Sequence, residues 1–261
     1  MKKRNYKREL EVAKSAAIEA GKKILEIYHS EDFGVEVKAD NSPLTKADKQ
    51  ANDIIGSILE KNFPEDSILS EESKDNLDRL NNEYCWIIDP LDGTKEFIKR
   101  NGEFTVNIAL SYMKRVILGV IYVPVKEELF YASYNNGAFL MVNNEITPVR
   151  VSNSTENLRI AVSRSHITEQ ENKLIKKYGI QNIIKSGSSI KGCLVANDIA
   201  DIYYRYGLTS EWDTAAMQCI VEEAGGIFRQ MDDTQMCYNR ENNLNEKGFY
   251  ILNKIENKME L

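Results

Sequence analysis

The sequence is organised around one stretch, Trp86-Ile87-Ile88-Asp89-Pro90-Leu91-Asp92-Gly93-Thr94. The apolar residues 84–88 predict a buried β-strand, and the proline and glycine that follow predict that this strand breaks sharply into a tight turn. The carboxylates of Asp89 and Asp92 would then stand together at a strand end, with the Leu91 carbonyl between them as a third oxygen. Hard oxygen donors grouped in this way suit Mg²⁺; the alternative interpretation is an Asp-Pro turn with a capping aspartate.

The composition is that of an ordinary globular protein, since 42% of the 261 residues are hydrophobic and 28% are charged. This length is enough for one large domain or two modest ones. The net charge of −6 argues against nucleic acid as the main partner. Divalent cations would still let an acidic chain bind a polyanionic small molecule.

The chain begins with a basic segment, Met1-Lys2-Lys3-Arg4, and no apolar run of signal-peptide or membrane-spanning length follows it. We therefore expect no transmembrane segment and a cytoplasmic protein, with peripheral contact between the basic start and the inner membrane as a further option. The four cysteines form no Cys-x-x-Cys pair, and there are only two histidines. Any metal site must therefore rest on carboxylates rather than on thiolates or imidazoles.

Two amphipathic helices precede the central stretch. Apolar residues recur at helical spacing over 4–28 and again from Thr45 to Phe63, where Thr45 is the expected N-cap. Asp48 lies three residues after this cap, so its simplest role is the acid of a capping box. Residues 74–83 are polar and predict a surface loop.

The remainder of the chain divides into two patterns. Strand-like runs from 104 to 142 predict a meandering, mostly antiparallel sheet, whereas strands and helices alternate from 159 to 224 and predict an α/β unit. Serine and asparagine accumulate between these segments. We therefore expect an N-terminal part over 1–150 and a C-terminal part over 151–261.

Further candidate site residues lie at the ends of these predicted elements. Glu71 follows the short strand 68–70, although most paired glutamates are simply solvated. Asp213 stands in the first turn of an apolar helix, where an acid also complements the helix dipole. The small residues 186–189 precede another helix, a geometry that binds phosphate but that also starts many ordinary helices.

Taken together, three motifs resemble the inositol monophosphatase superfamily of lithium-sensitive, magnesium-dependent phosphatases, to which fructose-1,6-bisphosphatase is related. They are the stretch 86–94, Glu71-Glu72-Ser73 and Glu211-Trp212-Asp213-Thr214-Ala215-Ala216. The continuation from Asp92 to Asn107 is most similar to the branch of bacterial 3'(2'),5'-bisphosphate nucleotidases. Two shorter segments, Ser163-Arg164-Ser165-His166 and Gly187-Ser188-Ser189-Ile190-Lys191, also resemble that branch.

This resemblance implies a layered αβαβα sugar-phosphatase fold, with an N-terminal α+β part and a C-terminal α/β part. The implied activity is removal of the 3'-phosphate from adenosine 3',5'-bisphosphate, giving AMP and phosphate. Some members of the branch also act on the sulfated form, which links them to sulfur assimilation. The implied partner is thus a small nucleotide bisphosphate, and the implied assembly is a monomer or a homodimer.

The resemblance also implies residue roles. Two Mg²⁺ ions would be held by Glu71, Asp89, the Leu91 carbonyl, Asp92 and Asp213. A third, weaker ion near Asp48 and Glu71 is a further option. Catalysis would rest on Thr94, which orients the attacking water, with Asp48 and Glu71 in support. Substrate contacts would come from the Gly93 and Thr94 amides at the scissile phosphate, His166 near the adenosine, and Ser188, Lys191 and Arg205 at the 5'-phosphate.

Several alternatives remain open at this point. Lys191 and Arg205 are also readily interpreted as ordinary surface charges. A different substrate within the same fold would make the chain an inositol monophosphatase or another sugar phosphatase. A chain that has lost turnover would be a non-catalytic metal- or nucleotide-binding protein, which the intact acids disfavour. Two places depart from the expected pattern: Gly192 stands where an aromatic residue is common, and Asn197-Asp198 stands where a glycine is usual.

Overall fold

The central stretch forms part of a seven-stranded sheet with the order β3-β4-β5-β6-β7-β8-β9. The computed structural model describes residues 6–30, 33–37, 43–75, 77–165 and 167–261. β3 runs parallel to β4, and each other neighbouring pair in this sheet is antiparallel. The strands are β3 Ser67–Ser70, β4 Tyr84–Asp92, β5 Thr105–Tyr112, β6 Arg115–Val123, β7 Glu128–Ser133, β8 Ala138–Val142 and β9 Glu145–Val149.

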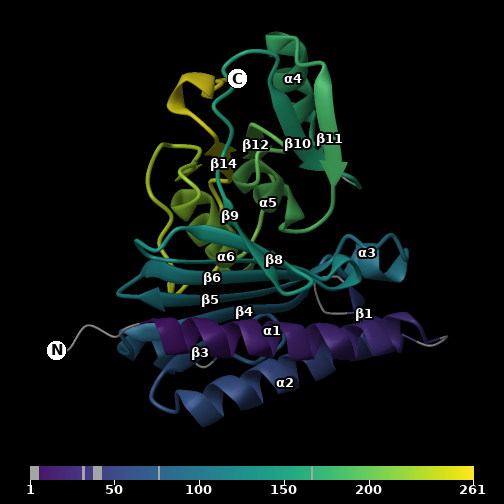
Figure 1. Ribbon diagram of the computed structural model, residues 1–261, viewed down its shortest axis with the longest axis vertical. Helices are drawn as coiled ribbons and strands as arrows, with labels where there is room; N and C mark the ends of the chain where they lie inside the picture. The colour runs from purple at the N-terminus through teal and green to yellow at the C-terminus, as the bar shows by residue number, and fades with distance from the viewer. Residues whose placement is uncertain (1–5, 31–32, 38–42, 76, 166) are drawn as a thin grey trace.

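Two long helices, α1 Lys7–Tyr28 and α2 Lys46–Asn62, cover one face of this sheet (Figure 1). The inner face of α1 is rich in alanine, and Ala13 and Ala20 are fully buried. Small side chains let the helix approach the sheet closely, and Trp86 of β4 fills the same core. The amphipathic patterns of both helices therefore predicted their buried faces correctly.

A second, mixed sheet has the order β11-β10-β12-β14-β13. The helices α5 and α6 lie between the two sheets, and α4 covers the outer face of the second sheet (Figure 1). The layers therefore follow the order αβαβα, which confirms the predicted fold class. These elements are β10 Arg159–Ser163, α4 Glu169–Tyr178, β11 Asn182–Ser186, α5 Ile190–Ala196, β12 Ile202–Arg205, α6 Glu211–Glu223, β13 Ile227–Gln230 and β14 Phe249–Leu252.

Short elements connect these layers. They are β1 Glu36–Val37, β2 Pro43–Leu44, α3 Thr94–Ile98, and the 3₁₀ turns η1 Asp78–Asn81, η2 Pro124–Lys126 and η3 Ile255–Asn257. The prediction of a plain surface loop over 74–83 was wrong in part, because η1 forms there and buries Arg79 to 2% exposure. The division of the chain near residue 150 stays a prediction.

The predicted break of the central strand at Pro90 was wrong. β4 continues through the proline to Asp92, and its register against β5 shifts between Asp89 and Asp92. Asp89 pairs with Asn107 and Asp92 with Thr105, so β4 holds one extra residue in this interval. A bulge of this kind accommodates a proline, which cannot donate to the ladder, and it re-aims the neighbouring side chains.

Candidate active site

Three carboxylates converge where β4 ends and α6 begins. Each of Asp89, Asp92 and Asp213 offers an oxygen atom, and these three atoms lie within 4.8 Å of one another. The β4 bulge supplies the first two residues and the first turn of α6 supplies the third. Residues 89 and 213 are thus brought together by the packing of α6 against the large sheet, which the sequence alone does not show.

The electrostatics of this cluster favour a bound cation. Burial raises the pKa of Asp89 well above its usual value, and repulsion from Glu71, Asp92 and Asp213 raises it further. Burial and the charge of Asp92 also raise the pKa of Asp213, to about 8. Like charges this close in a buried site repel strongly unless a cation or protons neutralise them. Carboxylate oxygens are the ligands that Mg²⁺ prefers, so the donor set fits that ion.

Two further predicted ligands, Glu71 and the Leu91 carbonyl, lie beside this group. The Glu71 backbone N–H donates to the carbonyl of Ile88 at 3.2 Å, which holds the end of β3 against β4. Its carboxylate raises the pKa of Asp89, but it is not among the three mutually close acids. The Leu91 N–H donates to Asp89 Oδ1 at 3.1 Å, and its carbonyl lies 3.3 Å from Thr94 Oγ1.

Asp48 caps α2, as the sequence suggested, and it also contacts Thr94. Its Oδ2 accepts from the backbone N–H of Thr45 at 2.7 Å and from the Thr45 hydroxyl at 2.5 Å, which completes a capping box on α2. Its Oδ1 accepts from Thr94 Oγ1 at 3.0 Å. Thr94 opens α3 directly after Gly93, whose φ of +95° strains any residue with a Cβ.

The orientation of Asp92 depends on residues that the sequence analysis did not single out. Asp92 Oδ2 accepts from the backbone N–H of Ser189 at 2.6 Å and from Asn107 Nδ2 at 3.4 Å. The Ser189 hydroxyl in turn lies 2.8 Å from Asn107 Oδ1 and 2.8 Å from Thr105 Oγ1. Polar residues at 105 and 107 in an otherwise apolar strand are the only sequence signal for this network.

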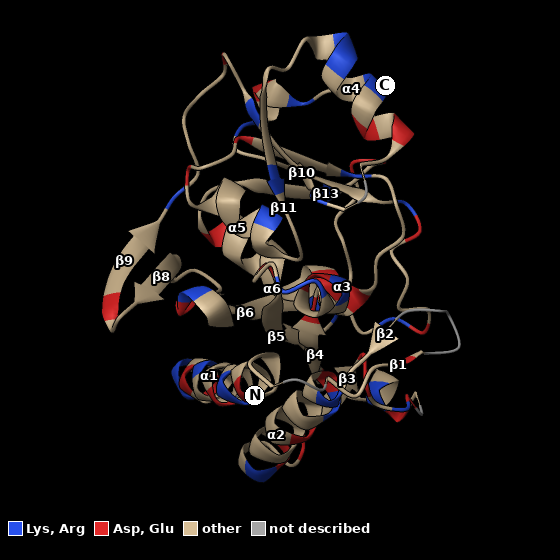
Figure 2. Ribbon diagram, turned by 90° about the vertical axis from the view of Figure 1, so that its right-hand side faces the viewer, with Lys and Arg blue, Asp and Glu red and all other residues tan. Residues whose placement is uncertain are grey.

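A basic pocket of about 210 Å³ adjoins the acidic cluster, and both Asp92 and Asp213 contribute to its lining. It also contains Ser188, Lys191 and Arg205, the three residues predicted to meet a second phosphate. The start of α5 and the end of β12 supply these residues, and α5 and α6 stand close together in Figure 2. Ser163 and Thr209 also line this pocket. The sequence analysis quoted Ser163 within a motif without giving it a role, and it did not mention Thr209.

The three predicted residues have polar groups available to a ligand. Lys191 is only 6% exposed, which excludes its interpretation as a surface charge, and its Nζ donates to the Ser188 carbonyl at 2.5 Å. Burial lowers the pKa of Lys191 to about 8, against the opposing effect of Asp92. Among the described residues, the buried Ser188 hydroxyl has no hydrogen-bond partner. His166, predicted near the adenosine, lies outside the described residues.

The match to a known family covers nearly the whole chain. The model of the inositol monophosphatase family matches residues 5–258. The chain belongs to the inositol monophosphatase family. The predicted resemblance is thereby confirmed, and members of this family generally depend on metal ions.

Among curated relatives, family members named 3'(2'),5'-bisphosphate nucleotidase CysQ are similar to this chain. The protein from Buchnera aphidicola is 40% identical over 235 residues, which cover 88% of each chain. The protein from Escherichia coli K12 is 36% identical over 234 residues, covering 89% of this chain and 94% of that protein.

Solved structures of the inositol monophosphatase family share this fold. CysQ from Bacteroides thetaiotaomicron is 40% identical with a TM-score of 0.84, covering 95% of this chain and 98% of that chain. An inositol monophosphatase from Anabaena is 28% identical with a TM-score of 0.76, covering 97% and 94%.

One departure of this family member from the expected pattern has a structural explanation. A Cβ on Gly192 would stand 2.2 Å from the Sδ and Cγ atoms of Met217. Met217 therefore occupies the space beside α5 that a larger side chain at 192 would need. Asp198 takes the left-handed backbone conformation (φ +55°) that the usual glycine would adopt freely.

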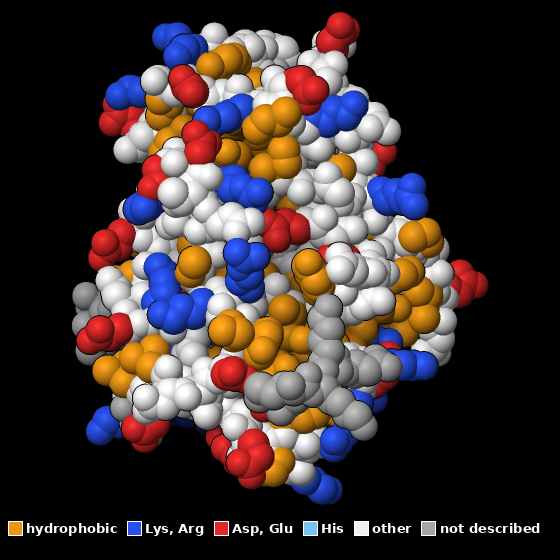
Figure 3. Space-filling model, turned by 90° about the vertical axis from the view of Figure 1, so that its left-hand side faces the viewer, with side chains coloured by type: hydrophobic (Ala, Val, Ile, Leu, Met, Phe, Trp, Pro, Cys, Tyr) orange, Lys and Arg blue, Asp and Glu red, His pale blue; other side chains and the backbone are white. Residues whose placement is uncertain are grey.

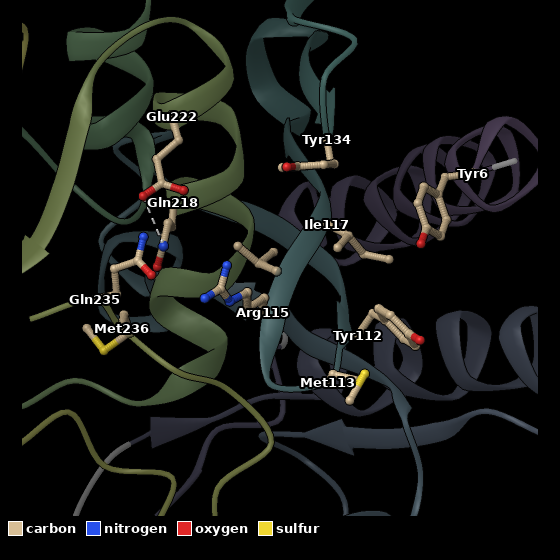
Figure 4. Close-up of a pocket in the computed structure, with 11 residues that line it drawn as sticks. Tyr6, Tyr112, Met113, Arg115, Ile117, Tyr134, Gln218, Glu222, Gln235 and Met236 are labelled. Carbon is tan, nitrogen blue, oxygen red and sulfur yellow. Dashed lines mark hydrogen bonds between the residues drawn. The ribbon is translucent and has the colours of Figure 1, made fainter. Parts of the chain in front are cut away.

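A larger hollow, of about 510 Å³, lies away from these acids. It is formed by the start of α1, the β5–β6 turn and the second half of α6, and Figure 4 shows Arg115, Gln218 and Glu222 around it. None of the predicted site residues lines this hollow.

On the face drawn in Figure 3, acidic and basic side chains are interspersed around hydrophobic ones. Within the described residues, no helix is both long enough and apolar enough to span a bilayer.

Proposed function

We propose that this chain is a Mg²⁺-dependent phosphatase that removes the 3'-phosphate from adenosine 3',5'-bisphosphate, giving AMP and phosphate. The sulfated form of this nucleotide is a second proposed substrate, and sulfur assimilation is the proposed context. The observation that carries the proposal is the basic pocket beside the acidic cluster. A substrate with two phosphates places one at the acids and their ions and the other at Lys191 and Arg205.

The names of the relatives support the same substrate. Proteins named 3'(2'),5'-bisphosphate nucleotidase are 36–40% identical to this chain over most of its length. The inositol monophosphatase neighbour is 28% identical, and a phosphate on inositol leaves the basic pocket without an anion. Inositol phosphates and sugar phosphates are therefore the second-ranked substrates.

The metal chemistry rests on the carboxylates of the site. Glu71, Asp89, Asp92 and Asp213, with the Leu91 carbonyl, would hold two or three Mg²⁺ ions. Such ions lower the pKa of a bound water and neutralise charge on the phosphate in the transition state. The hydrogen bonds from Ser189 and Asn107 to Oδ2 of Asp92 hold that carboxylate in one orientation.

The attacking water is oriented by Thr94 in this proposal. Its hydroxyl donates to Asp48 Oδ1 at 3.0 Å, so its lone pairs are directed elsewhere and can accept from a water. Asp48 is buried and its second oxygen is fixed by Thr45, which leaves a single carboxylate oxygen for this relay. The backbone amides of Gly93 and Thr94 would hold the scissile phosphate, with Glu71 supporting the water.

In this proposal, the 5'-phosphate end of the nucleotide binds in the basic pocket. Lys191 and Arg205 provide positive charge for the 5'-phosphate, and the Ser188 hydroxyl provides a donor that is unused in the described residues. A buried hydroxyl without a partner costs free energy, and a phosphate oxygen would satisfy it. His166 is proposed to contact the adenosine.

Phosphate release from a small substrate panel tests this function. The panel contains adenosine 3',5'-bisphosphate, adenosine 3'-monophosphate, inositol 1-phosphate and fructose 1,6-bisphosphate, each with Mg²⁺ and with a chelator. We expect chelator-sensitive release that is far the fastest with the bisphosphate nucleotide. Preference for inositol 1-phosphate would retain the metal site and contradict the assigned substrate.

The contribution of the basic pocket is isolated by two variants. Lys191→Met and Arg205→Met should each raise the KM for the bisphosphate, because the 5'-phosphate loses an opposite charge. The same variants should leave the KM for adenosine 3'-monophosphate nearly unchanged, because that ligand has no 5'-phosphate. Equal losses for both ligands would mean that these residues do not recognise the second phosphate.

A further inference from the structure

The buried side chain of Arg79 connects the segment that follows Glu71 with the segment that binds the start of α6, where Asp213 lies. Arg79 lies in η1, within the connection that starts at Glu71 and returns to β4. Its side chain is only 2% exposed, although Asp78 and Leu80 on either side of it are exposed. Guanidinium groups are seldom buried unless all of their donors are satisfied, so its partners indicate what it holds.

The partners of Arg79 come from both halves of the chain. Its Nε and Nη2 atoms bind the carboxylate of Asp75, with the shortest distance at 2.7 Å. Its Nη1 donates to Asn239 Oδ1 at 2.8 Å, and its Nη2 donates to the Arg240 carbonyl at 2.8 Å. Asn239 returns a hydrogen bond from Nδ2 to the Arg79 carbonyl at 3.0 Å. The planar fork of the guanidinium thus connects η1 to the segment at 239–240.

The segment at 239–240 is bound in turn to the start of α6. The backbone N–H groups of Asn239 and Arg240 donate to the two oxygens of Glu211, at 2.6 and 2.9 Å. Glu211 is fully buried and is the first residue of α6, two positions before Asp213. The Arg240 Nε also donates to Glu211, at 3.0 Å. Glu211 was part of a motif in the sequence, but the proposed chemistry gives it no role.

From this chain of contacts we propose that Arg79 is a positioning residue for the acidic cluster. Through Asn239, Arg240 and Glu211 it fixes the connection that follows Glu71 relative to the helix start that carries Asp213. The proposal rests on the metal-binding part of the proposed function. Residues that orient ligands from outside the metal site typically change metal affinity by about 10–100-fold when they are replaced.

The alternative is that Arg79 only stabilises the fold, and the structure offers a matched control for that role. Arg159 also binds a carboxylate with two of its nitrogen atoms, since Nε and Nη2 donate to Asp201 at 3.0 and 2.9 Å. It further contacts the carboxylate of Asp198 at 2.7 Å and the Asp198 carbonyl at 2.8 Å. Asp201 precedes β12, whose opposite end carries Arg205. The network of Arg159 therefore stabilises the second sheet, at the end of β12 that lies far from Arg205.

The test compares Arg79→Met, Arg79→Lys, Asn239→Ala and Arg159→Met with the wild-type chain. Mg²⁺ affinity is measured by titration calorimetry without substrate, and the unfolding midpoint is measured with a chelator. We expect about tenfold weaker Mg²⁺ binding for the Arg79 and Asn239 variants and wild-type affinity for Arg159→Met. Arg79→Lys keeps a charge for Asp75 but cannot also reach Asn239 and Arg240, so its affinity falls while its midpoint stays nearer to that of the wild type.

Two results would overturn the proposal. One is wild-type Mg²⁺ affinity in Arg79→Lys and Asn239→Ala; the other is an equal loss of affinity in Arg159→Met. Should Arg79→Met fail to fold, the two milder variants decide the question. A wild-type chain that binds no divalent cation would overturn this proposal together with the proposed metal chemistry. If the variants show the expected Mg²⁺ affinities but the wild-type chain releases no phosphate from the nucleotide, the proposed function is contradicted and the role of Arg79 is retained.

Discussion

The Thr94 hydroxyl donates a hydrogen bond of 3.0 Å to Oδ1 of Asp48, a residue whose other oxygen caps helix α2. One carboxylate thus joins the start of a long packing helix to the first residue of α3. Because Thr45 fixes Oδ2, the direction of Oδ1 is set by the helix and not by a flexible side chain. A rigid acceptor of this kind is what a positioned proton relay needs.

The first prediction concerns this relay. Thr94→Val removes the hydroxyl and keeps the shape of the side chain, so kcat should fall by about 10²–10⁴-fold with little change in KM. Thr94→Ser should retain most of the activity. Thr45→Val removes the hydroxyl on the opposite side of the same carboxylate and costs about 1 kcal/mol of stability as a lost helix cap. Its backbone N–H still donates to Asp48 Oδ2, so kcat should fall far less than in Thr94→Val. Equal losses of kcat in Thr94→Val and Thr45→Val would contradict the relay.

The second prediction concerns metal removal and pH. Burial and mutual repulsion raise the pKa values of Asp89, Asp92 and Asp213, the last to about 8. The metal-free folded chain therefore holds protons at pH values where the unfolded chain has released them. The free energy of unfolding of the metal-free chain should thus fall as pH rises from about 4 toward 8.

Urea unfolding at several pH values, with a chelator or with Mg²⁺, measures this effect. Saturating Mg²⁺ should remove most of the fall in the free energy of unfolding, because the ions neutralise the carboxylates in place of the protons. Asp213→Asn lacks one of the repelling charges, so its metal-free stability should depend less steeply on pH. A metal-free chain whose stability rises over this whole range would show that the acids do not repel one another as the structure indicates.

Much of the site was predictable because its acids stand at the ends of recognisable elements. Asp89 and Asp92 follow an apolar run, and Asp213 opens an apolar helix. The bulge that carries β4 past Pro90 was not predictable, because the pairing of Asp92 with Thr105 is a contact between strands. The sequence analysis missed the short strands β13 and β14. Each has only four residues, which is too few to show a clear alternation of polar and apolar residues.

Contacts between distant segments account for the other omissions. Ser189 holds Asp92 through a backbone N–H, a group that every residue except proline has, so no side-chain pattern could reveal it. Arg79 looked like part of a polar surface loop because two of its partners, Asn239 and Arg240, lie about 160 positions away. Local patterns thus indicated the candidate ligands, whereas the contacts that orient them depend on the tertiary fold.

The third prediction concerns Lys191 and the pH dependence of substrate recognition. Burial lowers its pKa to about 8, so the ammonium charge is present below that pH and is lost as pH rises through it. The value of kcat/KM for adenosine 3',5'-bisphosphate reflects the free enzyme and should therefore decline above about pH 8. Adenosine 3'-monophosphate uses the same metal site without the 5'-phosphate and should show a smaller decline. Identical pH profiles for the two ligands would exclude Lys191 as the titrating group.

The last prediction concerns the contact between α6 and the large sheet, on which the position of Asp213 depends. A Cβ on Gly119 of β6 would stand 2.5 Å from the carbonyl oxygen of Ala216 and 2.9 Å from its Cα atom. Both are backbone atoms of α6, so the helix itself would have to move. Gly119→Ala should therefore lower the free energy of unfolding by about 1–3 kcal/mol, the usual cost of overpacking.

Gly56 provides the control for this substitution. A Cβ there meets no atom within 4 Å, and the residue lies inside α2. Gly56→Ala should raise the free energy of unfolding by about 1 kcal/mol, because alanine favours the helix. Urea unfolding of both variants, together with their Mg²⁺ affinities, separates the two effects. A shift of α6 carries Asp213 with it, so Gly119→Ala should also weaken Mg²⁺ binding, and a destabilised Gly119→Ala with unchanged affinity would show that the acidic cluster tolerates movement of that helix.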